Sequence, residues 1–396
     1  MSAPGRLPDV TVRLRAKRRI EARHPWVFAD DVARAEGAAH GDLVRVRGNA
    51  GEVLGVAFWS ARSKIALRMI ALDDVLPDAA FWAARVDAAF TARGPDVGGW
   101  PARRLLFGEG DGVPGLIADL YGSHLVVQIL TAGTERIFDQ VVARIRERVP
   151  LDSVLARNDP SVRALEGLPR EVRQLSGTTP DEIVVLEDGV LYAADPWRGQ
   201  KTGAFLDQRE NRVACRAFAR GRVLDAFAYH ASFALHAARE AAEVVVCDSS
   251  PDALSRGRVN AERNGATNLT FVAANAFEDL RERERRGERF DLILLDPPAF
   301  AESRGDVAAA RRGYKEINLR ALRLLSPGGV LMTSSCSYNL DESAFEEVLR
   351  DAAADARRDV HVVARRGQAA DHPVRLTFPE GRYLKCFVLR EAAEAV

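Results

Sequence analysis

An acidic residue and a thiol each follow an apolar run in the second half of the chain, where they could act on a substrate. Asp296 follows the run FDLILL and precedes Pro297 and Pro298, which cannot continue a β-ladder, so the acid should be held at a strand tip. Cys336 follows the run GGVLMTSS and has serines on both sides. If these strands are neighbours, the thiol lies beside the carboxyl group and becomes a candidate nucleophile.

Polar residues also end the three preceding apolar runs. Asp225 ends the first run and Asp248 ends the second, 23 residues later, a spacing typical of a carboxylate that binds the ribose hydroxyls of a nucleoside cofactor. Acids at such positions also cap helices, so the pair alone leaves a structural role open. Asn275 ends the third run, where an amide and an apolar edge could meet an adenine ring. The residues expected near the cofactor are Asp225, Phe227, Tyr229, Asp248, Ser249, Asn275, Ala276 and Asp296.

An acid and a thiol beside a nucleoside cofactor suit methylation of carbon 5 of a pyrimidine. That carbon is too weak a nucleophile to attack a methylsulfonium unaided. A thiolate that adds at carbon 6 makes the ring an enamine, and a hydrogen bond at ring nitrogen 3 favours the addition. Cys336 would be the nucleophile and Asp296 the group at nitrogen 3. The base that removes the carbon-5 proton is not evident from the sequence.

The elements that must position these residues form an α/β domain over residues 196–396. Five continuous apolar runs, separated by segments long enough for crossover helices, predict a doubly wound parallel sheet buried on both faces. The helix after the second run has clear ends, because Ser250 can cap it, Pro251 suits its first turn and Asn264-Gly265 stops it. VHVVARRG and RYLKCFVLR predict a closing pair of strands.

Two further regions precede this domain. Residues 1–73 alternate short apolar and polar runs with glycines between them, which predicts a small β-barrel. Residues 74–195 combine an amphipathic helix with two hairpins, one of them around Asp188-Gly189, and predict an α+β domain.

The first 70 residues carry 13 Lys/Arg against 7 Asp/Glu, although the whole chain has 56 of each and a net charge of zero. Basic residues crowd one stretch with a single acid, a density suited to phosphates. They are Arg13, Arg15, Lys17, Arg18, Arg19 and Arg23. A solvated strand and turn is the structural alternative for this stretch.

Composition excludes several classes of protein. The chain has 396 residues, of which 47% are hydrophobic and 28% charged, as in ordinary globular proteins. No run is long enough for a membrane helix, and the first ten residues lack the apolar core of a signal peptide, so we expect a cytoplasmic protein. Its four cysteines are too few and too far apart for a disulfide framework, and none falls in a CxxC pair that would suggest zinc. Net neutrality permits a monomer or a homodimer.

The order of several motifs resembles a known family. HPWVF, QKTGAFLDQRENR, DPPAF, RGYKEIN, SSCS, ADHPV and YLK occur along nearly the whole chain as in the bacterial class I S-adenosylmethionine-dependent ribosomal RNA cytosine-5 methyltransferases of the large (23S) subunit. The resemblance implies an RNA-binding PUA-like barrel, a small α+β domain and a Rossmann-like methyltransferase domain. It also implies S-adenosylmethionine (SAM) as cofactor and ribosomal RNA as partner.

The resemblance assigns roles to individual residues. The family's nucleophile falls on Cys336 and its DPP acid on Asp296. Its remaining cofactor contacts fall on Lys201, Thr202, Gly203, Leu206, Asp207 and Gln208. Contacts with the target nucleotide and its flanks are expected from Pro297, Pro298, Phe300, Tyr314, Arg13, Arg15, Arg18, Arg19 and Trp26.

The chain departs from the family after the first strand, where Tyr229-His230-Ala231-Ser232-Phe233 contains no glycine. Glycine there allows positive φ and a close approach of the backbone to the cofactor. The departure motivates one alternative, an RNA-binding protein that has lost catalysis. A second alternative is methylation of an exocyclic amino group, which also uses an acid before two prolines but has no use for Cys336.

Overall fold

The computed structural model describes residues 7–94, 102–301 and 304–392, and contacts divide the chain into two units. Unit 1 comprises residues 1–185, 194–206 and 370–381, and unit 2 comprises residues 186–193, 207–369 and 382–396. The two regions expected as separate domains, 1–73 and 74–195, thus share one unit for most of their length. Part of the reason is that Trp26 and Arg68 of the first region both hydrogen-bond Glu109 of the second.

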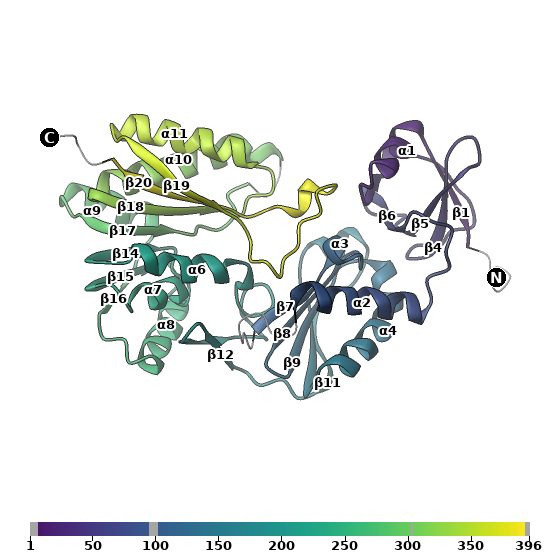
Figure 1. The fold of residues 1–396 in the computed structure, drawn as a ribbon, viewed down its shortest axis with the longest axis horizontal. Helices are drawn as coiled ribbons and strands as arrows, with labels where there is room; N and C mark the ends of the chain where they lie inside the picture. The colour runs from purple at the N-terminus through teal and green to yellow at the C-terminus, as the bar shows by residue number, and fades with distance from the viewer. Residues whose placement is uncertain (1–6, 95–101, 302–303, 393–396) are drawn as a thin grey trace. The chain divides into compact units, whose positions relative to one another are not determined.

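The N-terminal part of unit 1, purple in Figure 1, is built on one sheet. This sheet has six strands in the order β2-β6-β5-β4-β1-β3. Its strands are β1 (Asp9–Val12), β2 (Trp26–Phe28), β3 (Val32–Ala35), β4 (Leu43–Arg47), β5 (Val53–Trp59) and β6 (Ile65–Ala71). The basic stretch is the helix α1 (Leu14–Glu21), not a strand and turn. Ala16 and Ile20, four residues apart, are its buried face, which leaves the opposite face to the arginines.

The rest of unit 1 is built on a five-stranded sheet with the order β11-β10-β9-β8-β7. Its strands are β7 (Ala102–Phe107), β8 (Leu116–Tyr121), β9 (His124–Ile129), β10 (Ser153–Asn158) and β11 (Glu171–Gly177). Helices α2 (Ala79–Arg93) and α4 (Ala132–Arg148) bury Trp82, Val86, Val141 and Ile145 in a core shared with the sheet. The short helices are α3 (Gly108–Asp111) and α5 (Val162–Leu165). The hairpin around Asp188-Gly189 is confirmed as β12 (Ile183–Glu187) and β13 (Val190–Ala194), and its residues 186–193 belong to unit 2.

Unit 2 contains a seven-stranded sheet with the order β16-β15-β14-β17-β18-β20-β19. The five predicted runs are β14 (Arg222–Ala226), β15 (Glu243–Asp248), β16 (Leu269–Ala273), β17 (Phe290–Leu295) and β18 (Leu325–Ser335), and all pair in parallel. The closing pair is β19 (Val360–Arg366) and β20 (Lys385–Glu391), with β20 antiparallel to both neighbours. The expected doubly wound α/β fold is therefore confirmed.

Helices cover both faces of this sheet (Figure 1). One face carries α9 (Ala276–Arg285), α10 (Val307–Leu324) and α11 (Glu342–Ala356). The other carries α6 (Arg209–Cys215), α7 (Ser232–Ala237) and α8 (Pro251–Arg263). The predicted ends of α8 are confirmed, since Ser250 accepts a hydrogen bond from the Ala253 N–H and Gly265 has φ +60°. Among the described residues, no helix is long and apolar enough to cross a membrane.

Candidate active site

The carboxyl ends of the parallel strands meet at one edge of the unit 2 sheet. Strand β14 lies between β15 and β17, so the chain order reverses there. Ligands of open α/β sheets bind outside the carboxyl ends of the strands at this reversal. The candidate residues that follow β14, β15, β16, β17 and β18 are therefore gathered along one edge.

Asp296 and Cys336 follow two neighbouring strands, β17 and β18. The Cys336 Sγ lies 3.9 Å from the carbonyl oxygen of Pro297, the residue directly after Asp296. The Ala301 N–H donates to the Ser337 Oγ at 3.2 Å and joins the same two loops a second time. Cys336 is half-buried rather than sealed in the core. The arrangement expected from the two motifs is thus present in unit 2.

The other three thiols differ from Cys336 in their surroundings. Cys215, Cys247 and Cys386 are fully buried, each at 0% exposure. Burial raises the pKa of Cys247 and of Cys386 to about 12, and it raises the pKa of Cys215 further. Buried, protonated thiols behave as small apolar groups, so only Cys336 combines access with a position at a strand end.

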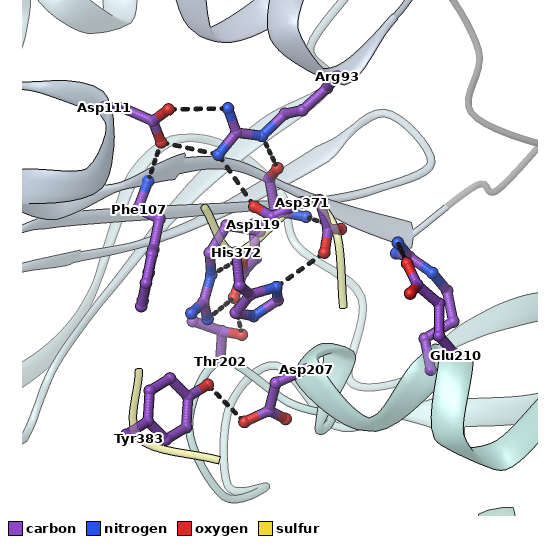
Figure 2. A network of polar contacts seen from close by, with 12 residues as sticks. Arg93, Phe107, Asp111, Asp119, Thr202, Asp207, Glu210, Asp371, His372 and Tyr383 are labelled. Atoms are coloured by element: carbon purple, nitrogen blue, oxygen red, sulfur yellow. Dashed lines mark hydrogen bonds and ion pairs between the residues drawn. The ribbon is translucent and has the colours of Figure 1, made fainter. Parts of the chain in front are cut away.

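Asp296 is held by residues at the start of α6. The Gln208 Nε2 donates to the Asp296 Oδ1 at 2.7 Å, and the Asn211 Nδ2 donates to the Gln208 Oε1 at 2.6 Å. Asp207 accepts a hydrogen bond of 2.6 Å from the Tyr383 hydroxyl, as Figure 2 shows. Asp207 and Gln208, both predicted on the cofactor side, therefore lie in this part of unit 2 and are buried.

Tyr314 requires a correction. We expected it to contact the substrate, but its side chain is fully buried and packs between Phe300 and Phe345. Its hydroxyl lies 2.9 Å from the Ser337 Oγ. The burial follows from its place on the face of α10 that packs on the sheet. Tyr314 therefore supports the turn that carries Cys336. Of the other predicted substrate contacts in this loop, Phe300 is half-buried, Pro298 is exposed and Pro297 is buried.

The glycine-free loop after β14 adopts the backbone that glycine usually provides. Phe227, Tyr229 and Ala231 have φ values of +67°, +49° and +67°. Gly257 on α8 makes room for this loop, because a Cβ there would lie 3.2 Å from the Ala231 Cβ. The loop thus keeps a left-handed conformation with larger side chains, at a cost of roughly 1 kcal/mol or more per residue.

The two acids of the first and second strands bind the backbone of neighbouring loops. Asp225 is 1% exposed and accepts from the Ala234 N–H at 2.9 Å. Burial raises its pKa well above the ordinary value. Asp248 is half-buried and accepts from the N–H groups of Tyr229 and Ser250, each at 2.8 Å. Asp248, followed by exposed Ser249, is therefore the acid better placed for a ligand.

A cluster of aromatic rings lies beside these acids. The Phe227 ring is 6.2 Å from Phe277 and 6.4 Å from Phe300, and all three are half-buried. Asn275 is exposed and caps α9 by accepting from the Phe277 N–H, with buried Ala276 between them. These rings provide an apolar surface that suits a purine, at the same edge of the sheet as the half-buried carboxylate of Asp248.

Four predicted cofactor residues, Lys201, Thr202, Gly203 and Leu206, belong to unit 1. Thr202 is fully buried, and its hydroxyl donates to the Asp119 Oδ2 at 2.6 Å (Figure 2). The Thr202 hydroxyl also lies 3.0 Å from the Tyr121 hydroxyl. The Lys201 Nζ lies over the Phe205 ring. Gly203 has φ +130°, so this turn needs a glycine.

The basic helix and Trp26 also lie in unit 1. Arg13, Arg15 and Arg18 are exposed, and Arg15 pairs with Asp31 at 2.7 Å. The Trp26 prediction needs revision, because its indole N–H donates to Glu109 at 2.7 Å and its ring packs edge-on against Phe378 at 4.6 Å. The half-buried Arg19 lies over the Phe28 ring. Exposed arginines thus remain candidates for phosphate contacts, whereas Trp26 has a structural role.

Sequence reasoning missed two residues near the thiol. Lys385 begins β20 opposite Ser335, and Tyr383 binds Asp207. The motif YLK contains both, but nothing in the one-dimensional pattern shows which strand it pairs with. A lysine directly before the apolar run CFVL is the available signal.

Comparison with known proteins agrees with this geometry. Residues 116–377 match the family described as S-adenosylmethionine-dependent methyltransferase, and residues 10–72 match a PUA-like domain. The chain belongs to the S-adenosylmethionine-dependent methyltransferases. A relative of this methyltransferase from Aeromonas salmonicida is named "Ribosomal RNA large subunit methyltransferase I"; it is 42% identical over 93% of this chain and 95% of its own. A relative of the same name from Salmonella arizonae is 39% identical over 93% and 94%.

Solved structures show the same fold. A putative SAM-dependent methyltransferase from Streptococcus mutans superposes on this methyltransferase with a TM-score of 0.83 at 21% identity, over 96% of this chain and 99% of that one. A putative methyltransferase complexed with SAH gives a TM-score of 0.85 at 21% identity, with the same coverage. The expectation of SAM as cofactor is confirmed by the family, and the unit 2 residues fit it, because a carboxylate and aromatic rings suited to a nucleoside lie at the strand ends.

Proposed function

We propose that this methyltransferase forms 5-methylcytosine in large-subunit (23S) ribosomal RNA and that Cys336 is its nucleophile. The observation that supports this most strongly is the half-buried thiol beside the loop of Asp296, in a unit whose other three thiols are buried. The name shared by the relatives indicates the RNA. A methyltransferase for an exocyclic amino group would have no need for such a thiol.

The residues act in a defined order. The Cys336 thiolate adds to carbon 6 of the cytosine while the protonated carboxyl group of Asp296, held by Gln208, donates a hydrogen bond to ring nitrogen 3. SAM supplies an electrophilic methyl group. Carbon 5, made nucleophilic by the addition, would form the new carbon–carbon bond as the bond from the methyl group to sulfur breaks, which leaves S-adenosylhomocysteine. Loss of the carbon-5 proton to a base then expels the thiolate from carbon 6 and restores the aromatic ring.

The exposed arginines of α1 support binding of folded RNA. A base must leave its stack before it can enter a pocket, at a cost of a few kcal/mol, and phosphate contacts offset that cost. Arg13, Arg15 and Arg18 are exposed on or beside one short helix. We assign them to neighbouring phosphates, so reversing their charges should reduce methylation most at raised salt.

The test is transfer of labelled methyl groups from SAM to ribosomal RNA that lacks the modification, with bisulfite sequencing to locate the product. Cys336→Ala should abolish 5-methylcytosine. The matched control is Cys215→Ala, which removes a buried thiol on α6 and should keep it. Retained methylation by Cys336→Ala would refute the proposal and favour amino-group chemistry. Calorimetric titration with SAM checks separately that both variants bind cofactor.

A further inference from the structure

A buried lysine lies directly behind the turn that carries Cys336. Lys385 is 2% exposed and pairs in register with Ser335, the last residue of β18. Its Nζ donates to the carbonyl oxygens of Ser337 at 2.7 Å and Tyr383 at 2.9 Å. The ammonium therefore ties strand β20 to the residue that follows Cys336.

Burial of an ammonium group needs a reason, because leaving water is costly unless the charge is balanced. No carboxylate forms an ion pair with Lys385 among the described residues. Burial lowers the pKa of Lys385 to about 8, whereas the charges of Cys336 and, more weakly, Asp341 oppose that shift. Two further charged groups act on Lys385: Arg382 lowers its pKa and Glu342 raises it.

We propose that Lys385 is a positioning residue that fixes the Cys336 turn and stabilises the Cys336 thiolate. The two carbonyl contacts hold the ammonium at the turn, and a cation beside a thiol favours its deprotonated form. This role rests on the proposed function, since it concerns the thiol assigned as nucleophile. Asp296 and Tyr314, two titratable groups whose loops or side chains contact this turn, carry no positive charge, whereas the Lys385 ammonium does.

The experiment measures the rate at which iodoacetamide alkylates Cys336 as a function of pH, with the full chain and without RNA. The other thiols are buried, and mass spectrometry of the labelled peptide confirms the site. In the wild type, the midpoint of the rise in alkylation rate with pH should lie below about 8.5, the pKa of an ordinary thiol. Lys385→Met should raise the midpoint by about one pH unit and slow alkylation about tenfold at pH 7, with the same limiting rate at high pH.

Two more variants isolate the charge. Lys385→Arg keeps the cation and should restore most of the wild-type midpoint. Lys315→Met removes a half-buried lysine that pairs with Asp355 on the same unit, and it should leave the profile unchanged. An unchanged midpoint in folded Lys385→Met would overturn the proposal, as would a wild-type midpoint at or above about 8.5. Failure of the proposed function would appear instead as methylation by Cys336→Ala.

Discussion

Glu187 is the centre of a buried ion network whose loss should destabilise unit 2. Arg212 binds its carboxylate through two hydrogen bonds of 2.6 Å, His236 lies 3.0 Å from one oxygen and the Tyr192 hydroxyl donates to the other at 3.0 Å. Glu187 and Arg212 are 1% and 2% exposed. The network ties the β12–β13 hairpin to helices α6 and α7.

The pKa of Glu187 sets the expected loss in the free energy of unfolding. Burial would raise this pKa, but the charge and hydrogen bonds of Arg212 lower it from 4.5 to about 2. A shift of this size corresponds to about 3 kcal/mol of stability at pH 7. Because the folded pKa is the lower one, this stability is complete above pH 5 and is lost as the pH falls towards 2. Glu187→Gln should lose at least this amount, since it leaves the Arg212 charge buried and unpaired.

Urea unfolding monitored by thiol reactivity measures this loss. The described tryptophans all lie in unit 1, whereas the buried thiols lie in unit 2 and report its unfolding. With an m-value of about 2 kcal/mol/M, Glu187→Gln should lower the thiol midpoint by about 1.5 M at pH 7.

The matched control is Glu243→Gln, which breaks a pair with Arg222 in which both side chains are about 40% exposed. That pair should contribute less than about 1 kcal/mol. Equal midpoints for the two variants would refute the reasoning. A difference between wild type and Glu187→Gln that stays constant from pH 5 to pH 2.5 would refute it as well.

Two further predictions concern the active site. Tyr314→Phe removes the hydroxyl that lies 2.9 Å from the Ser337 Oγ, so it should cost about 1 kcal/mol of stability and slow methyl transfer. Its affinity for SAM, measured by calorimetry, should be retained. An unchanged rate of methyl transfer would exclude a role of Tyr314 in placing Cys336. Ala231→Val puts a β-branched residue at φ +67° in a buried site, so its free energy of unfolding in urea should fall by more than about 2 kcal/mol. Ala231→Gly should change that free energy by less than about 1 kcal/mol. Equal losses in these two variants would show that backbone strain is not the cause.

Several parts of the fold could be predicted from the sequence, because the local pattern of apolar and polar residues indicates which residues are buried. Each of the five apolar runs became a parallel strand, and the caps of α8 lie where Ser250 and Gly265 placed them. The stretch around α1 was misread because its few apolar residues, Ala16 and Ile20, give a weak helical period among many arginines. Position at a strand end also indicated Asp296 and Cys336 as neighbours.

What the amino-acid sequence determined by itself is the set of strands, their polar ends and the chemical types of the residues there. Only the tertiary structure decided which side chains meet. The Tyr314 side chain is buried, and the Trp26 indole hydrogen-bonds Glu109. Lys385 lies behind Cys336 because β20 pairs with β18 in one particular register. These contacts join residues far apart in the chain, so their energies depend on packing and register, which local periodicity does not encode.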